Sequence, residues 1–298
     1  MVINRWLNSV ASAGKHLLRR STRERPSIAS LCSELYSNKG EALGIALADE
    51  VVEAYNGLTG DEKSAFFDVL LRDYSPDPEL INRCAEAYRA ALTPEAYRAL
   101  ARAVESPRQT LFRRINMAPT GTRTVVNMRE DLLERLPAHP ELRMVDDDLQ
   151  HLLSSWFNPG FLQLRTMDWQ TPAVVLEKLI EYEAVHEMQG WDDLRRRLDA
   201  KDRRCFGFFH PALPDEPLIF VEVALVTAIS SSVQTILAPH EGVVPQQRIN
   251  TAIFYSISNC QPGLRGISFG NFLIKQVVMR LKDEMPQLNE FATLSPIP

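Results

Sequence analysis

The chain has 298 residues, 45% of them hydrophobic, and a net charge of −5 at pH 7. This length is sufficient for two domains with cores of their own, and the acidic balance, without a long run of Lys and Arg, argues against a nucleic-acid partner. No run of 18 apolar residues occurs in the sequence, so we expect no membrane-spanning helix.

The first 23 residues are basic and contain no acidic residue. Mitochondrial transit segments have such a composition, but a basic first helix with Ile3, Leu7 and Val10 on one side also explains it. We favour the helix, and hence a cytoplasmic protein, with the mitochondrial matrix as the alternative.

Apolar residues recur at helical spacing from residue 27 to about 156. Thr59 and Glu62 are typical of a helix start, and so is Thr93 before a proline and an acid. Asn127 and Glu130 have the capping-box spacing and predict another start. Short polar connections join these helices, as in a bundle. We therefore expect residues 1–157 to form an all-α domain for packing and self-association.

Two charged runs are interpreted as exposed helix surface. Asp146-Asp-Asp148 lacks the spacing of a calcium loop. Arg195-Arg-Arg197 is expected on a solvated helix face rather than in a nucleic-acid site.

The pattern changes at Asn158-Pro-Gly160, a strong turn signal. Strands interleaved with helices indicate an α/β domain over residues 158–298. The predicted strands are 161–165, 205–209, 218–225, 251–258 and 291–294, and the predicted helices are 171–180, 231–237 and 272–282.

For three residues on these strands, the sequence predicts on which face of the sheet the side chain lies. Glu222 interrupts an apolar strand and is expected on an exposed face, although a buried functional carboxylate is the alternative. Tyr255 and Ser256 are adjacent on a strand, so their side chains are expected on opposite faces.

The cysteines and histidines do not form a recognisable site. The four cysteines never show CxxC spacing, so each thiol is interpreted as a small buried hydrophobe in a reducing compartment. Of the six histidines, His186 and His210 fall in the second domain, and both are interpreted as structural.

The most informative motif is RGISFGNFLIK, which runs from Arg265 to Lys275 between a strand and a helix. A Gly-rich turn that opens a helix directs backbone N–H groups outward and can bind an anion. Residues Arg265, Gly266, Ile267, Ser268, Phe269, Gly270 and Asn271 form the candidate loop. A plain glycine turn is the alternative, and a nicotinamide fingerprint is disfavoured because GxGxxG is absent.

This loop resembles the pyrophosphate loop of CoA-dependent acetyltransferase-like folds, in which Arg265, Ser268 and Gly270 would take the three defined positions. More specifically, the segments 252–258, 261–278 and 293–298 resemble the malonyl-CoA decarboxylase family, as do Asn158–Leu162, Glu183–His186 and Glu216–Leu218. The resemblance implies a helical oligomerisation domain followed by an acetyltransferase-like (GNAT-type) domain.

The resemblance also implies a reaction: malonyl-CoA is converted to acetyl-CoA and CO2 without a metal or an organic cofactor. Ser295 matches the catalytic Ser of the family, whereas the family's catalytic His has no counterpart among residues 1–298. We therefore expect the second domain to be incomplete at its C-terminus and this chain by itself to decarboxylate malonyl-CoA poorly or not at all. The alternatives are a CoA-binding module without catalysis, an acyl-CoA-dependent acyltransferase, and a non-enzymatic helical assembly domain.

Overall fold

The computed structural model describes residues 26–37, 40–183, 185–230, 232–237, 245–269 and 272–294. By its internal packing the chain divides into two compact units, one ending at Leu153 and the other beginning at Ser154. The predicted basic first helix or transit segment lies outside the described residues. Within the described part, no helix is long and apolar enough to cross a membrane.

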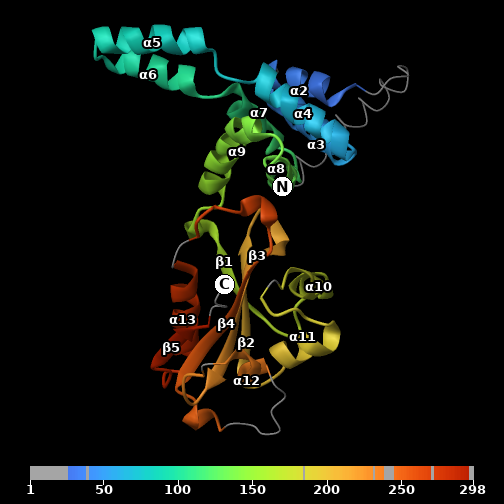
Figure 1. The fold of residues 1–298 in the computed structure, drawn as a ribbon, viewed down its shortest axis with the longest axis vertical. Helices are drawn as coiled ribbons and strands as arrows, with labels where there is room; N and C mark the ends of the chain where they lie inside the picture. Colours follow the sequence, from blue (N-terminus) through green and yellow to red (C-terminus); the bar gives the residue numbers. More distant parts are fainter. Residues whose placement is uncertain are drawn as a thin grey trace. The chain divides into compact units, whose positions relative to one another are not determined.

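The first unit is helical, as predicted, and Figure 1 shows it in blue to green. Its α-helices are α2 (Ile28–Ser37), α3 (Glu41–Asn56), α4 (Gly60–Asp73), α5 (Pro78–Ala90), α6 (Pro94–Val104), α7 (Pro107–Ile115), α8 (Gly121–Arg135) and α9 (Arg143–Trp156). The predicted helix starts at Thr59 and Thr93 are confirmed. Thr59 forms a capping box with Glu62, and the Thr93 side chain accepts a hydrogen bond from the Ala96 amide.

The helix start predicted at Asn127 is wrong, because α8 begins at Gly121 and passes through Asn127 without a break. Gly121 packs so closely on the backbone of Ile115 and Asn116 that a Cβ would overlap them. Buried residues on both sides of Asn127, such as Val125 and Met128, keep one face of α8 in the core. The capping-box spacing therefore arose inside a helix by chance.

Two buried arginines tie α9 into the helical unit. Arg129 donates to Asp146 at 2.8 Å, and Arg108 donates to Asp148 at 2.8 Å and to the Leu70 carbonyl. Asp146 is buried, so the expectation that this acidic run lies on a helix surface is wrong for it. A buried carboxylate requires such a partner, which the local sequence does not reveal.

In the described part of the second unit, the strands form a five-stranded mixed sheet. Its strands lie in the order β1 (Gln163–Met167), β2 (Arg203–His210), β3 (Leu213–Val226), β4 (Thr251–Asn259) and β5 (Glu290–Thr293). The first three pairs are antiparallel, and β4 pairs with β5 in parallel. Parallel neighbours need a crossover, which α13 (Phe272–Glu284) supplies.

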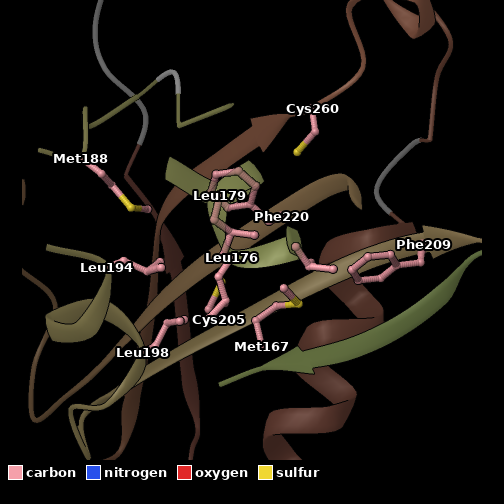
Figure 2. Close-up of a cluster of buried hydrophobic side chains, with 11 residues drawn as sticks. Met167, Leu176, Leu179, Met188, Leu194, Leu198, Cys205, Phe209, Phe220 and Cys260 are labelled. Carbon is pink, nitrogen blue, oxygen red and sulfur yellow. The ribbon is translucent and has the colours of Figure 1, made fainter. Parts of the chain in front are cut away.

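Helices lie on both sides of this sheet (Figure 1). Helix α13 lies on one side, and α10 (Ala173–Tyr182) and α11 (Trp191–Leu198) lie on the other. The short helix α12 (Val233–Leu237) packs Ile236 against Ile253 of β4. Figure 2 shows the core beneath α10 and α11, where Leu176, Leu179, Leu194 and Leu198 pack on the strand residues Cys205 and Phe220.

The predicted elements of this unit are largely confirmed, with shifted ends. The first strand begins at Gln163 rather than at Phe161, because Pro159–Phe161 forms a 3₁₀ turn capped by the Asn158 side chain. The strand predicted over 218–225 begins earlier, because β3 runs from Leu213 and includes the Pro-rich stretch after His210. Helix α11 contains Arg195–Arg197, which were expected on a helix, although no range was predicted for that helix.

Candidate active site

The loop between β4 and α13 has the strand–loop–helix arrangement that the sequence predicted. After β4 ends at Asn259, a 3₁₀ turn covers Pro262–Leu264, and α13 begins at Phe272. Gly266 has a φ of +79°, a left-handed conformation that favours glycine. A side chain at this position would strain the loop, so the glycine is needed for its shape.

Side chains in this loop alternate between solvent and core. Arg265 and Ser268 are exposed, whereas Ile267 and Phe269 are buried and anchor the loop. The Ile267 amide donates to the Leu264 carbonyl oxygen at 3.0 Å, so it is engaged within the loop. Gly270, Asn271 and Ser295 lie outside the described residues.

A buried polar tether holds the start of this loop against β3 and α10. The Gln261 amide nitrogen donates to Glu216 Oε2 at 3.0 Å. Lys178 lies 3.7 Å from Glu216 Oε1 and reaches it from α10. Sequence reasoning missed this tether, since Glu216 and Gln261 are 45 residues apart.

A second polar cluster lies beneath the middle of the sheet, on the α10 side. Glu183 follows α10 and accepts hydrogen bonds from the amides of Val185 and His186 at 2.9 and 2.7 Å. Its carboxylate also accepts from the hydroxyls of Ser256 at 2.8 Å and of Ser258 at 3.3 Å. Glu183 therefore joins the 185–186 turn to β4.

Tyr255 and Ser256 lie on the same face of the sheet, contrary to expectation. Glu222 of β3 is opposite Ser256 and Val223 is opposite Phe254, which leaves Tyr255 as the extra residue of a β-bulge. The bulge interrupts the alternation of side chains. As a result Ser256 bonds Glu183 while the Tyr255 ring lies 6.4 Å from the His186 ring.

Glu222 is buried, with an exposed fraction of 1%, so the expectation of an exposed face is wrong. Its Oε2 accepts from Arg197 of α11 at 2.9 Å. Arg197 is 8% exposed, which also corrects its assignment to a solvated helix face. Arg197 comes three residues after Leu194 and directly before Leu198, and both leucines are buried. This helical spacing was the signal in the sequence that Arg197 lies on the buried face.

Burial outweighs the salt bridge in setting the charge state of Glu222. Removal of the carboxyl group from water raises its pKa to about 7, although Arg197 opposes the shift. Glu222 Oε1 and the Tyr255 hydroxyl are both buried, and Tyr255 acts on the Glu222 carboxyl group as a hydrogen-bond donor that lowers its pKa, against the effect of burial. Burial also raises the pKa of the Tyr255 hydroxyl.

The remaining reactive side chains have structural surroundings. His210 packs between the rings of Phe157 and Phe161, and burial lowers its pKa. Cys205 and Cys260 are buried thiols whose pKa values are raised by burial, so neither is poised as a thiolate nucleophile. Among the described residues, no group of three or more His, Cys, Asp and Glu side chains is arranged to hold a metal ion.

Comparison with protein families gives two matches that follow each other along the chain. Residues 74–157 match the malonyl-CoA decarboxylase N-terminal domain, and residues 160–298 match the malonyl-CoA decarboxylase C-terminal domain.

Individual relatives give the same result. The mitochondrial malonyl-CoA decarboxylase of Anser anser anser is 39% identical over 264 residues, which are 84% of this chain and 52% of that protein. The mitochondrial enzyme of Mus musculus is 42% identical over 219 residues, which are 72% and 44% of the two chains. The chain thus spans about half the length of the curated relatives that it matches.

Solved structures agree in fold. The crystal structure of malonyl-CoA decarboxylase from Rhodopseudomonas palustris matches with a TM-score of 0.87 and 51% identity, over 92% of this chain and 67% of that one. The enzyme from Agrobacterium vitis matches with a TM-score of 0.86 and 50% identity, over 91% and 66% of the two chains.

Proposed function

The chain belongs to the malonyl-CoA decarboxylase family, and on this premise we propose that the full-length protein converts malonyl-CoA to acetyl-CoA and CO2. The observation that carries the proposal is the agreement of both domain families and of the fold over most of the chain. The proposed setting is cytoplasmic, with the mitochondrial matrix as the alternative.

The reaction breaks the bond between the carboxylate carbon and the α-carbon of the malonyl group. The electron pair moves into the thioester as an enolate, and the α-carbon then takes up a proton. Hydrogen-bond donors directed at the enolate oxygen stabilise the transition state, and an acid supplies the proton. The thioester itself accepts the electron pair, so the proposed chemistry requires no metal or organic cofactor.

The proposed CoA site is the 265–271 loop. The left-handed Gly266 and the alternation of exposed Arg265 and Ser268 with buried Ile267 and Phe269 support it. Main-chain amides from Ser268 towards the start of α13 would bind the pyrophosphate, with Arg265 adding a charge-assisted contact. The Ile267 amide is engaged with Leu264, so we assign Ile267 a packing role in this loop.

We further propose that the second unit is of the acetyltransferase-like (GNAT) type. Three antiparallel strand pairs are followed by a parallel β4–β5 pair, and the candidate CoA loop and α13 connect the last two strands. This connection places the loop at the end of β4.

Ser295 is the proposed catalytic hydroxyl, which would orient the malonyl carboxylate and relay the proton. It follows Leu294, whose amide donates to the Phe254 carbonyl oxygen at 2.9 Å.

Release of CO2 from malonyl-CoA by the purified full-length protein tests the function. We expect stoichiometric acetyl-CoA and CO2 in the presence of EDTA. Acetyl transfer to an amine without CO2 release would instead indicate an acyltransferase, and CoA binding without either product would indicate a binding module.

Loss of the Glu216 tether should weaken CoA binding. In a Glu216→Ala variant the Gln261 amide loses its carboxylate acceptor, and the loop that it anchors is less ordered before the ligand arrives. We expect the Kd for CoA, measured by calorimetry, to rise about tenfold, since a hydrogen bond to a charged group contributes about 1.5 kcal/mol or more. Glu181→Ala is the matched control, because Glu181 also lies near Lys178 but makes no contact with Gln261. An unchanged Kd in Glu216→Ala would contradict a role for the tether.

The helical unit is proposed to mediate assembly into a homo-oligomer. Helix α5 has no buried residue, and Figure 1 shows α5 and α6 extending away from the rest of the helical unit. Exposed apolar side chains on this hairpin are Leu80, Leu92, Tyr97 and Val104. An apolar surface of this kind is typical of a protein interface, and a second copy of the chain is the proposed occupant.

A Leu92→Glu, Tyr97→Glu variant should dissociate this assembly, because two charges would be buried at the interface without partners. We expect light scattering after size-exclusion chromatography to show a smaller species with unchanged helicity. Asn82→Glu, an exposed polar position on α5, adds the same kind of charge and should leave the assembly intact. An unchanged mass in the double variant would place the interface elsewhere.

A further inference from the structure

The β-bulge of β4 lies beside the chain that leads into the proposed catalytic residue. Among the described residues, β5 pairs with β4 from Thr251 to Phe254, and the bulge residue Tyr255 comes directly after the last of these pairs. Leu294 packs in the same hydrophobic cluster as Tyr255, the extra residue of the bulge. Since Leu294 directly follows β5 and packs with the bulge residue, the geometry of the bulge affects the position of Leu294.

Two contacts hold the bulge from the α10 side of the sheet. The Nε2–H of His186 donates to the carbonyl oxygen of Tyr255 at 3.1 Å. One residue further along, the Ser256 hydroxyl donates to Glu183 at 2.8 Å. Both contacts come from the segment between α10 and α11, and the Glu183 carboxylate also binds the amides of this segment.

Arg197 fixes that segment in turn. Its guanidinium donates to the carbonyl oxygens of His186 at 2.6 Å and of Glu187 at 3.4 Å. The other end of the guanidinium donates to Glu222 Oε2 at 2.9 Å. Glu222 lies opposite Ser256 in the strand register, so one buried arginine connects β3, His186 and Glu187 and, through His186, the bulge.

We propose that Arg197 and Glu222 are positioning residues, which fix the β4 bulge through His186 and thereby set the position of Leu294, the residue before the proposed catalytic hydroxyl. This inference rests on the proposed decarboxylase function. Stability alone does not explain a buried ion pair, because well-packed apolar residues often replace one without loss of stability. The multiple donors of the arginine side chain allow it to bind two carbonyl groups and a carboxylate at once.

The test separates positioning from stability by replacing both partners. An Arg197→Met single variant leaves Glu222 buried without a partner and can fail to fold. An Arg197→Met, Glu222→Leu variant removes both charges, so it should fold with a Tm within a few degrees of the wild type. It still lacks the donors to His186 and Glu187. Arg204→Met is the matched control, since Arg204 pairs with the partly exposed Glu284 on the surface of the same unit.

We expect the double variant to lose about 100-fold in kcat for malonyl-CoA, in line with the cost of a small misplacement of reacting groups. Its KM and its Kd for CoA should stay within about twofold of the wild type, because the 265–271 loop is tethered separately by Gln261. The control should retain both constants.

Three outcomes would overturn the inference: a folded double variant with kcat near the wild-type value, a loss confined to KM, or a double variant that does not fold. A wild-type protein that does not decarboxylate malonyl-CoA would instead refute the proposed function, so the two failures are distinguishable.

Discussion

A Ser295→Ala variant should bind CoA like the wild type and lose at least about 1,000-fold in the rate of CO2 release from malonyl-CoA. Groups that position or transfer a proton in the transition state typically contribute a factor of 100 to 10,000. The substitution removes one hydroxyl group and leaves the 265–271 loop unchanged. Single-turnover measurement of CO2 release, together with calorimetry of CoA binding, separates the chemical step from binding.

Ser155→Ala is the matched control for this experiment, because it removes an exposed serine hydroxyl from α9, outside the proposed site. Its rate of CO2 release should stay at the wild-type value. Comparable rates for Ser295→Ala and the wild type would exclude Ser295 as the catalytic hydroxyl.

Substitution of Glu222 by Gln should change how the stability of the protein depends on pH. Burial raises the pKa of Glu222 to about 7, so the folded state retains a proton on this carboxyl group that the unfolded state loses near pH 4.5. The resulting stabilisation is fully present below about pH 4.5 and is lost as the pH rises towards 7. The wild type should lose about 3 kcal/mol of unfolding free energy from this group over that interval.

The Glu222→Gln side chain is neutral at every pH and lacks this contribution. The unfolding free energy of the variant relative to the wild type should therefore rise by about 3 kcal/mol between pH 4.5 and pH 7.5. Urea unfolding monitored by tryptophan fluorescence measures this difference. The contributions of the other titrating groups cancel, because the variant and the wild type share them. Glu284→Gln, at a partly exposed ion pair, should show a much smaller change. If this difference in unfolding free energy did not change with pH, the Glu222 carboxyl group of the wild type would have the same pKa in the folded and unfolded states, which would contradict the prediction.

Much of the fold follows from local sequence signals. The predicted N-caps Thr59 and Thr93 do begin helices, α4 and α6. The apolar run at 251–258 forms the buried strand β4. The strand–glycine–helix arrangement around Gly266 was also predictable, since it depends on neighbouring residues. Local signals of this kind describe the helical unit and the mixed sheet in outline.

Contacts between distant residues were not predictable in this way. Whether Glu222 and Arg197 are exposed or buried depends on a pairing across 25 residues, and each residue taken alone fits a solvated surface. The bulge at Tyr255 likewise depends on the register of β3 against β4 and has no local signal such as a glycine. The assignment of Ser295 rests on family resemblance, because a serine before a proline has no distinguishing pattern.

The most direct test of the proposed site is a crystal structure of the full-length protein with CoA bound. We predict pyrophosphate oxygens within hydrogen-bond distance of the main-chain amides between Ser268 and the start of α13, with the Arg265 guanidinium beside them. CoA bound elsewhere on the protein, with this loop empty, would contradict the proposed site and the mechanism built on it.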